Sequence, residues 1–101
     1  MTEKYSDGRV DYNQYKNGMR NGYGIVTYGG GIVYRGEFKD DWRDGYGLMK
    51  DWRHDEYDGQ LKKNFYHGEG VFKEASTGRV ERRLYEDGEV KEVLEVIEQG
   101  H

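Results

Sequence analysis

The sequence contains no cysteine, and it holds few of the aliphatic side chains that fill most protein cores. The lack of cysteine excludes disulfide bonds and leaves the redox compartment unreadable. Leucine, isoleucine, valine and phenylalanine together number only 18 in 101 residues, a level close to that of disordered chains. Fifteen aromatic residues and a formal net charge of only −4 argue for a folded protein instead. A chain of this length forms one small domain, which we place at residues 1–101.

Several classes of partner are disfavoured by what the charge and hydropathy patterns lack. Sixteen basic residues against 20 acidic ones leave no polybasic surface for nucleic acid, and they disfavour binding to anionic lipid. No apolar run exceeds three residues, so no segment is expected to span a membrane. The first residues lack the apolar stretch of a signal peptide, which leaves a cytoplasmic location as the expectation by elimination.

The residues that usually carry catalysis are also scarce. Serine occurs only as Ser6 and Ser76, and His54, His67 and His101 are too scattered to suggest a metal site. We expect His67 to lie in a turn and His54 at a loop tip. The sequence therefore predicts no catalytic residue, no cofactor and no metal, and we interpret the protein as a non-enzyme.

An internal repeat of 23 residues organises the chain. Two glycines flank a single residue at 22–24, 45–47 and 68–70, each triplet starting 23 residues after the last. Agreement at many further positions, without a gap, indicates a repeated structural unit. Those positions are Met19, Trp42 and Phe65; Ile25, Leu48, Val71 and Leu94; Tyr15, Phe38, Leu61 and Leu84; and Asp11, Tyr34, Tyr57 and Val80.

Each unit reads as a β-hairpin followed by a connection. Tyr34, Gly36 and Phe38 alternate with polar residues, so they share one face of a strand, and the third unit repeats this pattern. A polar stretch over residues 40–44 leads to a second short strand at 45–50. Frequent glycine disfavours helix in this region, whereas tyrosine and valine favour strands.

The strand glycines have a packing role in this interpretation. A glycine in a strand leaves room for a large ring to lie on the bare backbone. Ten tyrosines are available for such packing, and each buried ring removes roughly 150–250 Å² from water. Because one hairpin alone is barely stable, hairpins stacked edge to edge would bury a continuous aromatic row. The sequence therefore predicts an all-β protein built from stacked antiparallel hairpins.

The pattern Tyr-x-Gly-x-Phe followed by Gly-Tyr-Gly, best preserved over residues 34–47, resembles the MORN repeat (membrane occupation and recognition nexus). The resemblance covers residues 11–90. It implies stacked hairpins in an elongated, curved, single-layer sheet with a groove, and it implies no activity. The units it defines are 11–33, 34–56 and 57–79, with a terminal cap at 80–99.

Both ends of the array depart from the repeat. Asp11 and Asn13 stand where the first unit should have tyrosine and glycine. In the last unit, Val80, Arg82 and Leu84 stand at the equivalent strand positions, and no Gly-x-Gly follows. Such departures are typical of the terminal repeats of stacked arrays.

Residues 89–98 leave two secondary structures open. Their β-branched residues favour a strand, whereas their apolar spacing and glutamates favour a short C-terminal helix. Either form would cover the open end of the sheet, or the segment would pair with a second copy to give a homodimer. The first ten residues are expected to be loosely held.

Aromatic side chains are the main candidates for binding, because tyrosine and tryptophan are enriched at hot spots. Trp52 is the sharpest case, since its counterparts in the repeat are the small residues Gly29 and Ala75. Core packing is the competing interpretation for the other aromatics, and simple solvation is the competing one for the acidic residues, which could otherwise steer a basic partner. The candidate partner-binding residues are Trp52, Trp42, Tyr46, Tyr23, Tyr34, Tyr57, Asp51 and Asp55.

The sequence thus favours a non-enzymatic module that binds another protein through an aromatic groove. It would act by occupancy, as an adaptor or as an occluding inhibitor or modulator of a larger protein, phage–host conflict being one such setting. A peripheral membrane or phospholipid-binding adaptor, as the family name suggests, is one alternative. A homo-oligomeric spacer joined through the terminal strands is the other.

Overall fold

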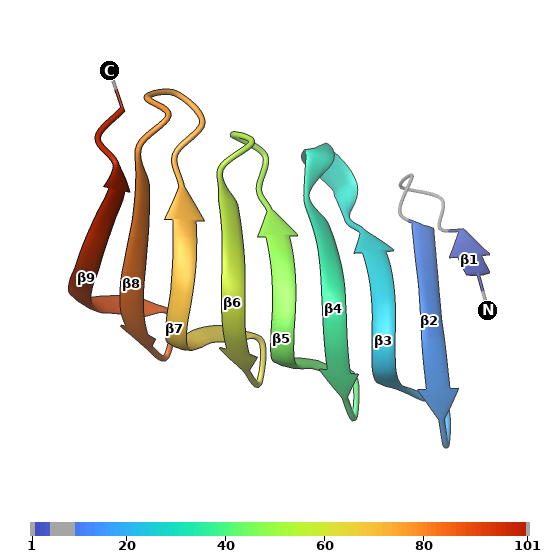
Figure 1. Ribbon diagram of the computed structural model, residues 1–101. Helices are drawn as coiled ribbons and strands as arrows, with labels where there is room; N and C mark the ends of the chain where they lie inside the picture. Colours follow the sequence, from blue (N-terminus) through green and yellow to red (C-terminus); the bar gives the residue numbers. More distant parts are fainter. Residues whose placement is uncertain (1, 5–9, 101) are drawn as a thin grey trace.

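A computed structural model describes the backbone of residues 2–4 and 10–100 and the side chains of residues 15–100. In this described part of the chain nine strands form one sheet, and each strand pairs antiparallel with its neighbours in the sequence (Figure 1). A 3₁₀ turn, η1 (Gly29–Gly31), lies between two of the strands. The strands are β1 (Thr2–Lys4), β2 (Val10–Lys16), β3 (Met19–Thr27), β4 (Val33–Lys39), β5 (Trp42–Lys50), β6 (Glu56–Lys62), β7 (Phe65–Lys73), β8 (Val80–Glu86) and β9 (Glu89–Glu98).

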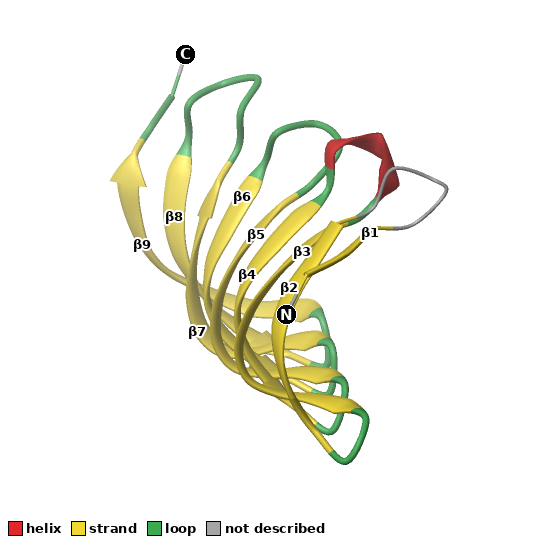
Figure 2. Cartoon of the chain, turned by 90° about the vertical axis from the view of Figure 1, so that its right-hand side faces the viewer, coloured by secondary structure: helices red, strands yellow, loops and turns green. Residues whose placement is uncertain are grey.

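The sheet is a single elongated layer that measures 42 × 24 × 16 Å. Seen from the side in Figure 2, the strands are strongly curved, and the hairpins stack behind one another. At one end of the strands the tight hairpin turns join each pair, and we call this side of the sheet the hairpin end. At the other end of the strands lie the connecting loops, and we call that side the loop end. The predicted array of stacked antiparallel hairpins is confirmed.

Two-residue turns with positive φ at both positions close the four hairpins. Two of them, Asn17-Gly18 and Asp87-Gly88, contain the expected glycine, whereas Asp40-Asp41 and Lys63-Asn64 contain none. Because the Asp40-Asp41 turn has only two residues, β5 already begins at Trp42. The expectation of a polar connection over 40–44 is therefore wrong, and the expected turn at His67 is wrong too, since this residue lies within β7.

Tyrosine rings lie on bare glycine backbone in the centre of the sheet. A Cβ atom added to Gly47 would fall 2.5 Å from the Tyr34 ring, and one added to Gly70 would collide with Tyr57 in the same way. The Tyr34 hydroxyl donates to the Glu37 carbonyl at 2.8 Å, which fixes the ring in place. Tyr34 has 0% of its surface exposed, although the sheet has only one layer. The predicted ring-over-glycine packing is confirmed.

The face that bears these rings is the core face, and the sheet bends toward it. Arg43, close to a hairpin turn, donates to the hydroxyl of Tyr28, in a connecting loop at the other end of the strands, at 3.3 Å. Burial raises the pKa of Tyr66 to about 12, because water cannot solvate its phenolate. The buried core consists of Val26, Tyr34, Phe38, Tyr57, Leu61 and Tyr85, flanked by Tyr28, Met49, Tyr66 and Phe72.

The last unit is displaced by one residue relative to the others. The loop over residues 74–79 has six residues, whereas those at 28–32 and 51–55 have five. A shift of one residue exchanges the two faces of a strand. The expectation that Val80, Arg82 and Leu84 take the positions of Tyr34, Gly36 and Phe38 is therefore wrong. The residues on the core face are Glu81, Arg83 and Tyr85, of which Glu81 and Tyr85 are buried.

Glu81 replaces the ring of the other units with a charged cluster. Its carboxylate accepts hydrogen bonds from Arg79 at 2.6 Å and from Arg83 at 2.8 Å. These hydrogen bonds lower the pKa of Glu81 below its ordinary value, and the bond from Arg79 has the largest effect. A buried carboxylate held by two guanidinium groups closes the aromatic row at this end.

Residues 89–98 form a strand, so of the two alternatives that the sequence left open the strand is confirmed and the short C-terminal helix is wrong. Strand β9 repeats the triplet Val-x-Glu three times over residues 90–98, and its register shifts at every triplet. Its valines lie opposite Tyr85, Arg83 and Glu81, and its ten residues pair with the seven of β8. The prediction about the first ten residues falls largely outside the described residues, although Thr2–Lys4 pair with β2.

Candidate functional site

The face opposite the core, the outer face, carries the exposed aromatic side chains of the repeats. Tyr23 and Tyr46 occupy equivalent positions in β3 and β5, and each leaves about half of its surface exposed (52% and 53%). The hydroxyl of Tyr46 donates to Asp58 on the adjacent strand, and this bond raises the pKa of the phenol. The outer face therefore presents rings, whereas the core face is filled by the chain itself.

A row of apolar and basic residues runs along the hairpin end of the outer face. Phe38 and Arg43 face the core, so their neighbours Lys39 and Trp42 face the other way. Lys39 and Trp42 are register partners directly beside the turn, and the hairpins before and after repeat the arrangement. We call this row the hairpin-end stripe. It consists of the pairs Lys16 with Met19, Lys39 with Trp42 and Lys62 with Phe65.

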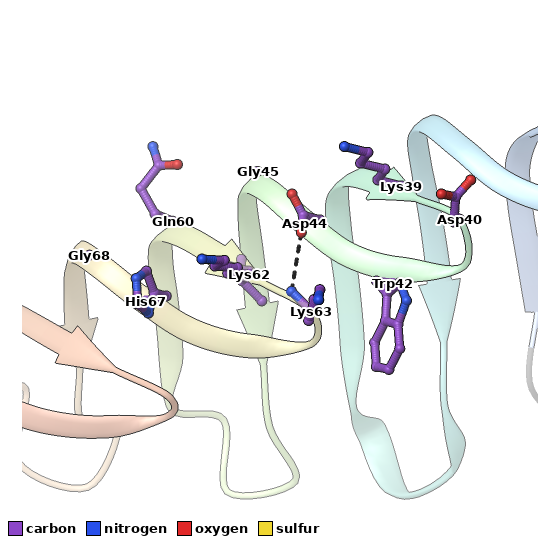
Figure 3. A pocket seen from close by; sticks show the side chains of 11 residues that line it. Lys39, Asp40, Trp42, Asp44, Gly45, Gln60, Lys62, Lys63, His67 and Gly68 are labelled. Atoms are coloured by element: carbon purple, nitrogen blue, oxygen red, sulfur yellow. Dashed lines mark hydrogen bonds between the residues drawn. The ribbon is translucent and has the colours of Figure 1, made fainter.

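A hollow of about 670 Å³ lies within the stripe, between the second and third hairpins. Figure 3 shows the side chains around it, among them Lys39 and Gln60, which extend to the same side of the ribbon. The Lys63 backbone N–H donates to the Asp44 carboxylate at 3.2 Å, which joins the two hairpins at its floor. The hollow is bordered by Lys39, Asp40, Trp42, Asp44, Gly45, Gln60, Leu61, Lys62, Lys63, His67 and Gly68.

Hydrogen bonds between successive turns hold the stripe in place. Asp41 donates its backbone N–H to the Arg20 carbonyl at 3.0 Å, and its carboxylate accepts the Arg20 N–H at 2.7 Å. Asn64 makes the same pair of bonds with Arg43, at 2.9 and 2.7 Å. The bond from the Arg20 backbone, reinforced by its guanidinium, lowers the pKa of Asp41. The spacing of the stripe is therefore fixed by backbone groups together with the short side chains of Asp41 and Asn64.

Comparison with known families decides what this array is. The MORN-repeat family model matches residues 14–33, 34–55 and 57–73, which is more than half of the chain. The chain belongs to the MORN-repeat family. A search of curated proteins finds no match. MORN repeats are generally binding modules and are typically non-catalytic.

Three of the predicted partner-binding residues lie on the outer face of this MORN array. Trp42 belongs to the stripe, and Tyr46 and Tyr23 lie farther along the same strands. Trp52 lies at the loop end instead, in the loop 51–55, and is 63% exposed. The Arg53 guanidinium lies 5.2 Å from the centre of the Trp52 ring. Strand β5 therefore lies between Trp42 and Trp52, so Trp52 is not part of the stripe.

The remaining predicted residues serve the MORN fold. Tyr34 and Tyr57 are fully buried, so these two rings have no surface to offer a partner. The Asp51 carboxylate accepts the backbone N–H groups of Arg53 at 2.8 Å and Asp55 at 3.1 Å within its own loop. Asp55 is buried, and its carboxylate accepts the Ala75 N–H of the next loop at 2.8 Å. Both aspartates thus order the connecting loops.

The sequence prediction missed most of the stripe. Met19 and Phe65 share a repeat position with Trp42, and that agreement favoured packing over exposure. The signal that points outward is the lysine three residues earlier in each unit, which the prediction did not use. Among the described residues, no helix is long and apolar enough to cross a membrane, and no group of metal-ligating side chains occurs.

Proposed function

We propose that this protein is a non-enzymatic module that binds another protein through the outer face of its sheet. The observation that carries the proposal is the exposure of Trp42 and Tyr46 on a rigid sheet whose opposite face is closed by its own core. Rigid aromatic side chains supply contact area at little cost in conformational entropy, which is why they dominate binding hot spots.

The interaction acts by occupancy. The described residues place their aromatic side chains on a surface and not in an enclosed active site, so the consequence of binding is to tether a partner or to cover part of it. The apolar residues of the stripe lie on β3, β5 and β7, and the two outer tyrosines lie farther along β3 and β5, so one partner can contact both sets. This surface replaces the aromatic groove that the sequence predicted, because the core rings fill the inner side of the bend.

Affinity purification from the source cell tests the proposal. Trp42→Ala combined with Tyr46→Ala should reduce the recovered partner by roughly 30-fold or more, the effect of losing one hot-spot side chain. Trp52→Ala is the matched control, because it removes an equally exposed tryptophan at the loop end. Equal recovery by the wild type and the double variant would contradict the proposal, and loss with Trp52→Ala alone would move the contact to the loop end.

A further inference from the structure

The hairpin-end stripe has a spacing that restricts what can lie on it. Neighbouring strands are about 4.8 Å apart, so equivalent residues of successive hairpins recur about every 9.6 Å along the sheet. Met19, Trp42 and Phe65 are therefore three apolar contacts in a line roughly 19 Å long. All three are exposed, with Phe65 the most open at 53%.

An α-helix matches this spacing better than an extended segment does. Residues seven apart on a helix lie on one face and are separated by about 10.5 Å. In a β-strand, a separation of about 10 Å corresponds to three residues, and residues three apart point to opposite faces. A helix of roughly 15 residues laid across the hairpins would thus bring one apolar side chain to each of the three contacts.

The charge of the stripe is opposite to that of the protein as a whole. Lys16, Lys39 and Lys62 are exposed beside the apolar contacts. Among the side chains described, from residue 15 to residue 100, none of these three ammonium groups has an ion-pair partner. Asp41 pairs with Arg20 at 3.2 Å. Around the hollow, three lysines (Lys39, Lys62 and Lys63) stand against two aspartates (Asp40 and Asp44). The stripe therefore has a small excess of positive charge on a chain whose net charge is −4.

The fourth hairpin marks where the stripe stops. At the positions of lysine and the apolar residue it carries Glu86 opposite Glu89. The basic and apolar pairing thus extends over three hairpins, and a segment with negative charge would be repelled beyond them.

We propose that the hairpin-end stripe binds an acidic amphipathic helix of a partner protein. The apolar side of the helix lies over Met19, Trp42 and Phe65, and its acidic flank meets the lysines. The hollow between the second and third hairpins takes one large apolar side chain of the helix beside Trp42. This inference rests on the proposed function, since it names the chemistry of the partner for the same surface.

Binding of a synthetic peptide to the full-length protein tests this inference. The probe is a helical peptide of about 18 residues with leucine along one face and glutamate elsewhere. Its scrambled form and a form with lysine in place of glutamate serve as control peptides. We expect the acidic peptide alone to bind, with an affinity that falls as salt is added. Trp42→Ala should weaken binding by roughly 30-fold.

A matched pair of charge reversals separates the stripe from general electrostatics. Lys39→Glu with Lys62→Glu should weaken peptide binding about tenfold or more. Lys50→Glu with Lys73→Glu makes the same change in net charge at the loop end, and it should leave binding within about twofold. Circular dichroism and urea unfolding of each variant confirm that the sheet is intact before binding is compared.

Four outcomes would overturn the inference. One is failure of the acidic peptide to bind the folded wild type, and another is an equal loss in both charge-reversal variants. The third is stripe-dependent binding to vesicles of phosphatidylserine and phosphatidylcholine that excludes the peptide. A cellular partner lost with Trp42→Ala and Tyr46→Ala but indifferent to the lysine reversals would leave protein binding standing and reject the helix.

Discussion

Substitution of Gly47 by alanine tests the packing that holds this sheet together. The new Cβ atom would lie 2.5 Å from the Tyr34 ring, well inside van der Waals contact. The ring cannot move aside easily, because it is fully buried and its hydroxyl is bound to the Glu37 carbonyl. Either the neighbouring strands must separate or the ring must leave the core.

The two responses set the range of the expected cost. Overpacking with local adjustment costs about 1–3 kcal/mol. Expulsion of a ring that buries roughly 150–250 Å² costs about 4–6 kcal/mol at 25 cal/mol per Å². We expect Gly47→Ala to lower the free energy of unfolding by at least about 3 kcal/mol, a large part of the 5–15 kcal/mol typical of a domain.

Urea unfolding followed by circular dichroism measures this cost, and two further variants give it meaning. Gly29→Ala is the control, because nothing lies within 4 Å of its added Cβ atom, and it should change stability by less than about 0.5 kcal/mol. In a Tyr34→Val background the added cost of Gly47→Ala should largely disappear. An undiminished cost in that background, or a Gly47→Ala protein as stable as the wild type, would refute ring-over-glycine packing.

Three other predictions concern titration and register. Burial raises the pKa of Tyr66 from 10 to about 12, so the free energy of unfolding should be unchanged below pH 10 and should fall between pH 10 and 12. Tyrosinate absorbance and circular dichroism, followed together, measure this. The pKa of Asp41 is lowered, so its contribution to stability should be present above about pH 4 and fade below it. Asp41→Asn, which removes the charge, should be less stable than the wild type at pH 7 and should approach it in acid, and an equal difference at both pH values would count against this. Deleting Ser76 shortens the loop 74–79 to five residues and should turn Tyr85 outward, which proteolysis would detect as a loosened β8–β9 hairpin, whereas Ser76→Gly should remain resistant.

Most of the fold could be predicted from the sequence because each unit repeats both its glycines and its alternation. Tyr34, Gly36 and Phe38 fall on one face, as expected, and the equivalent residues of the next unit do the same. The register of the last unit could not be predicted, since the one extra residue lies in a polar loop with no pattern of its own. The short turn at Asp40-Asp41 was also hidden, because positive φ at two successive aspartates has no glycine to signal it.

The candidate site was less accessible to sequence reasoning than the fold. Periodicity identifies which residues share a position but not which side of a one-layer sheet is closed by its bend. Tyr34 stands two residues before Gly36 and Tyr46 stands between two glycines, yet the first is buried and the second is half exposed. The distinction arises from the curvature of the sheet, which brings Arg43 and Tyr28 together over the core face.

The outermost strand, β9, has a consequence for polymerisation. A straight, regular edge offers an incoming chain an evenly spaced ladder of amide and carbonyl groups. In β9 an additional residue is inserted at each of three successive triplets, so the spacing of those groups is repeatedly interrupted. A second copy of the chain that paired with β9 would have to match the same three insertions and would place its own glutamates beside Glu92 and Glu95. The irregular edge strand therefore disfavours the growth of fibrils by strand addition.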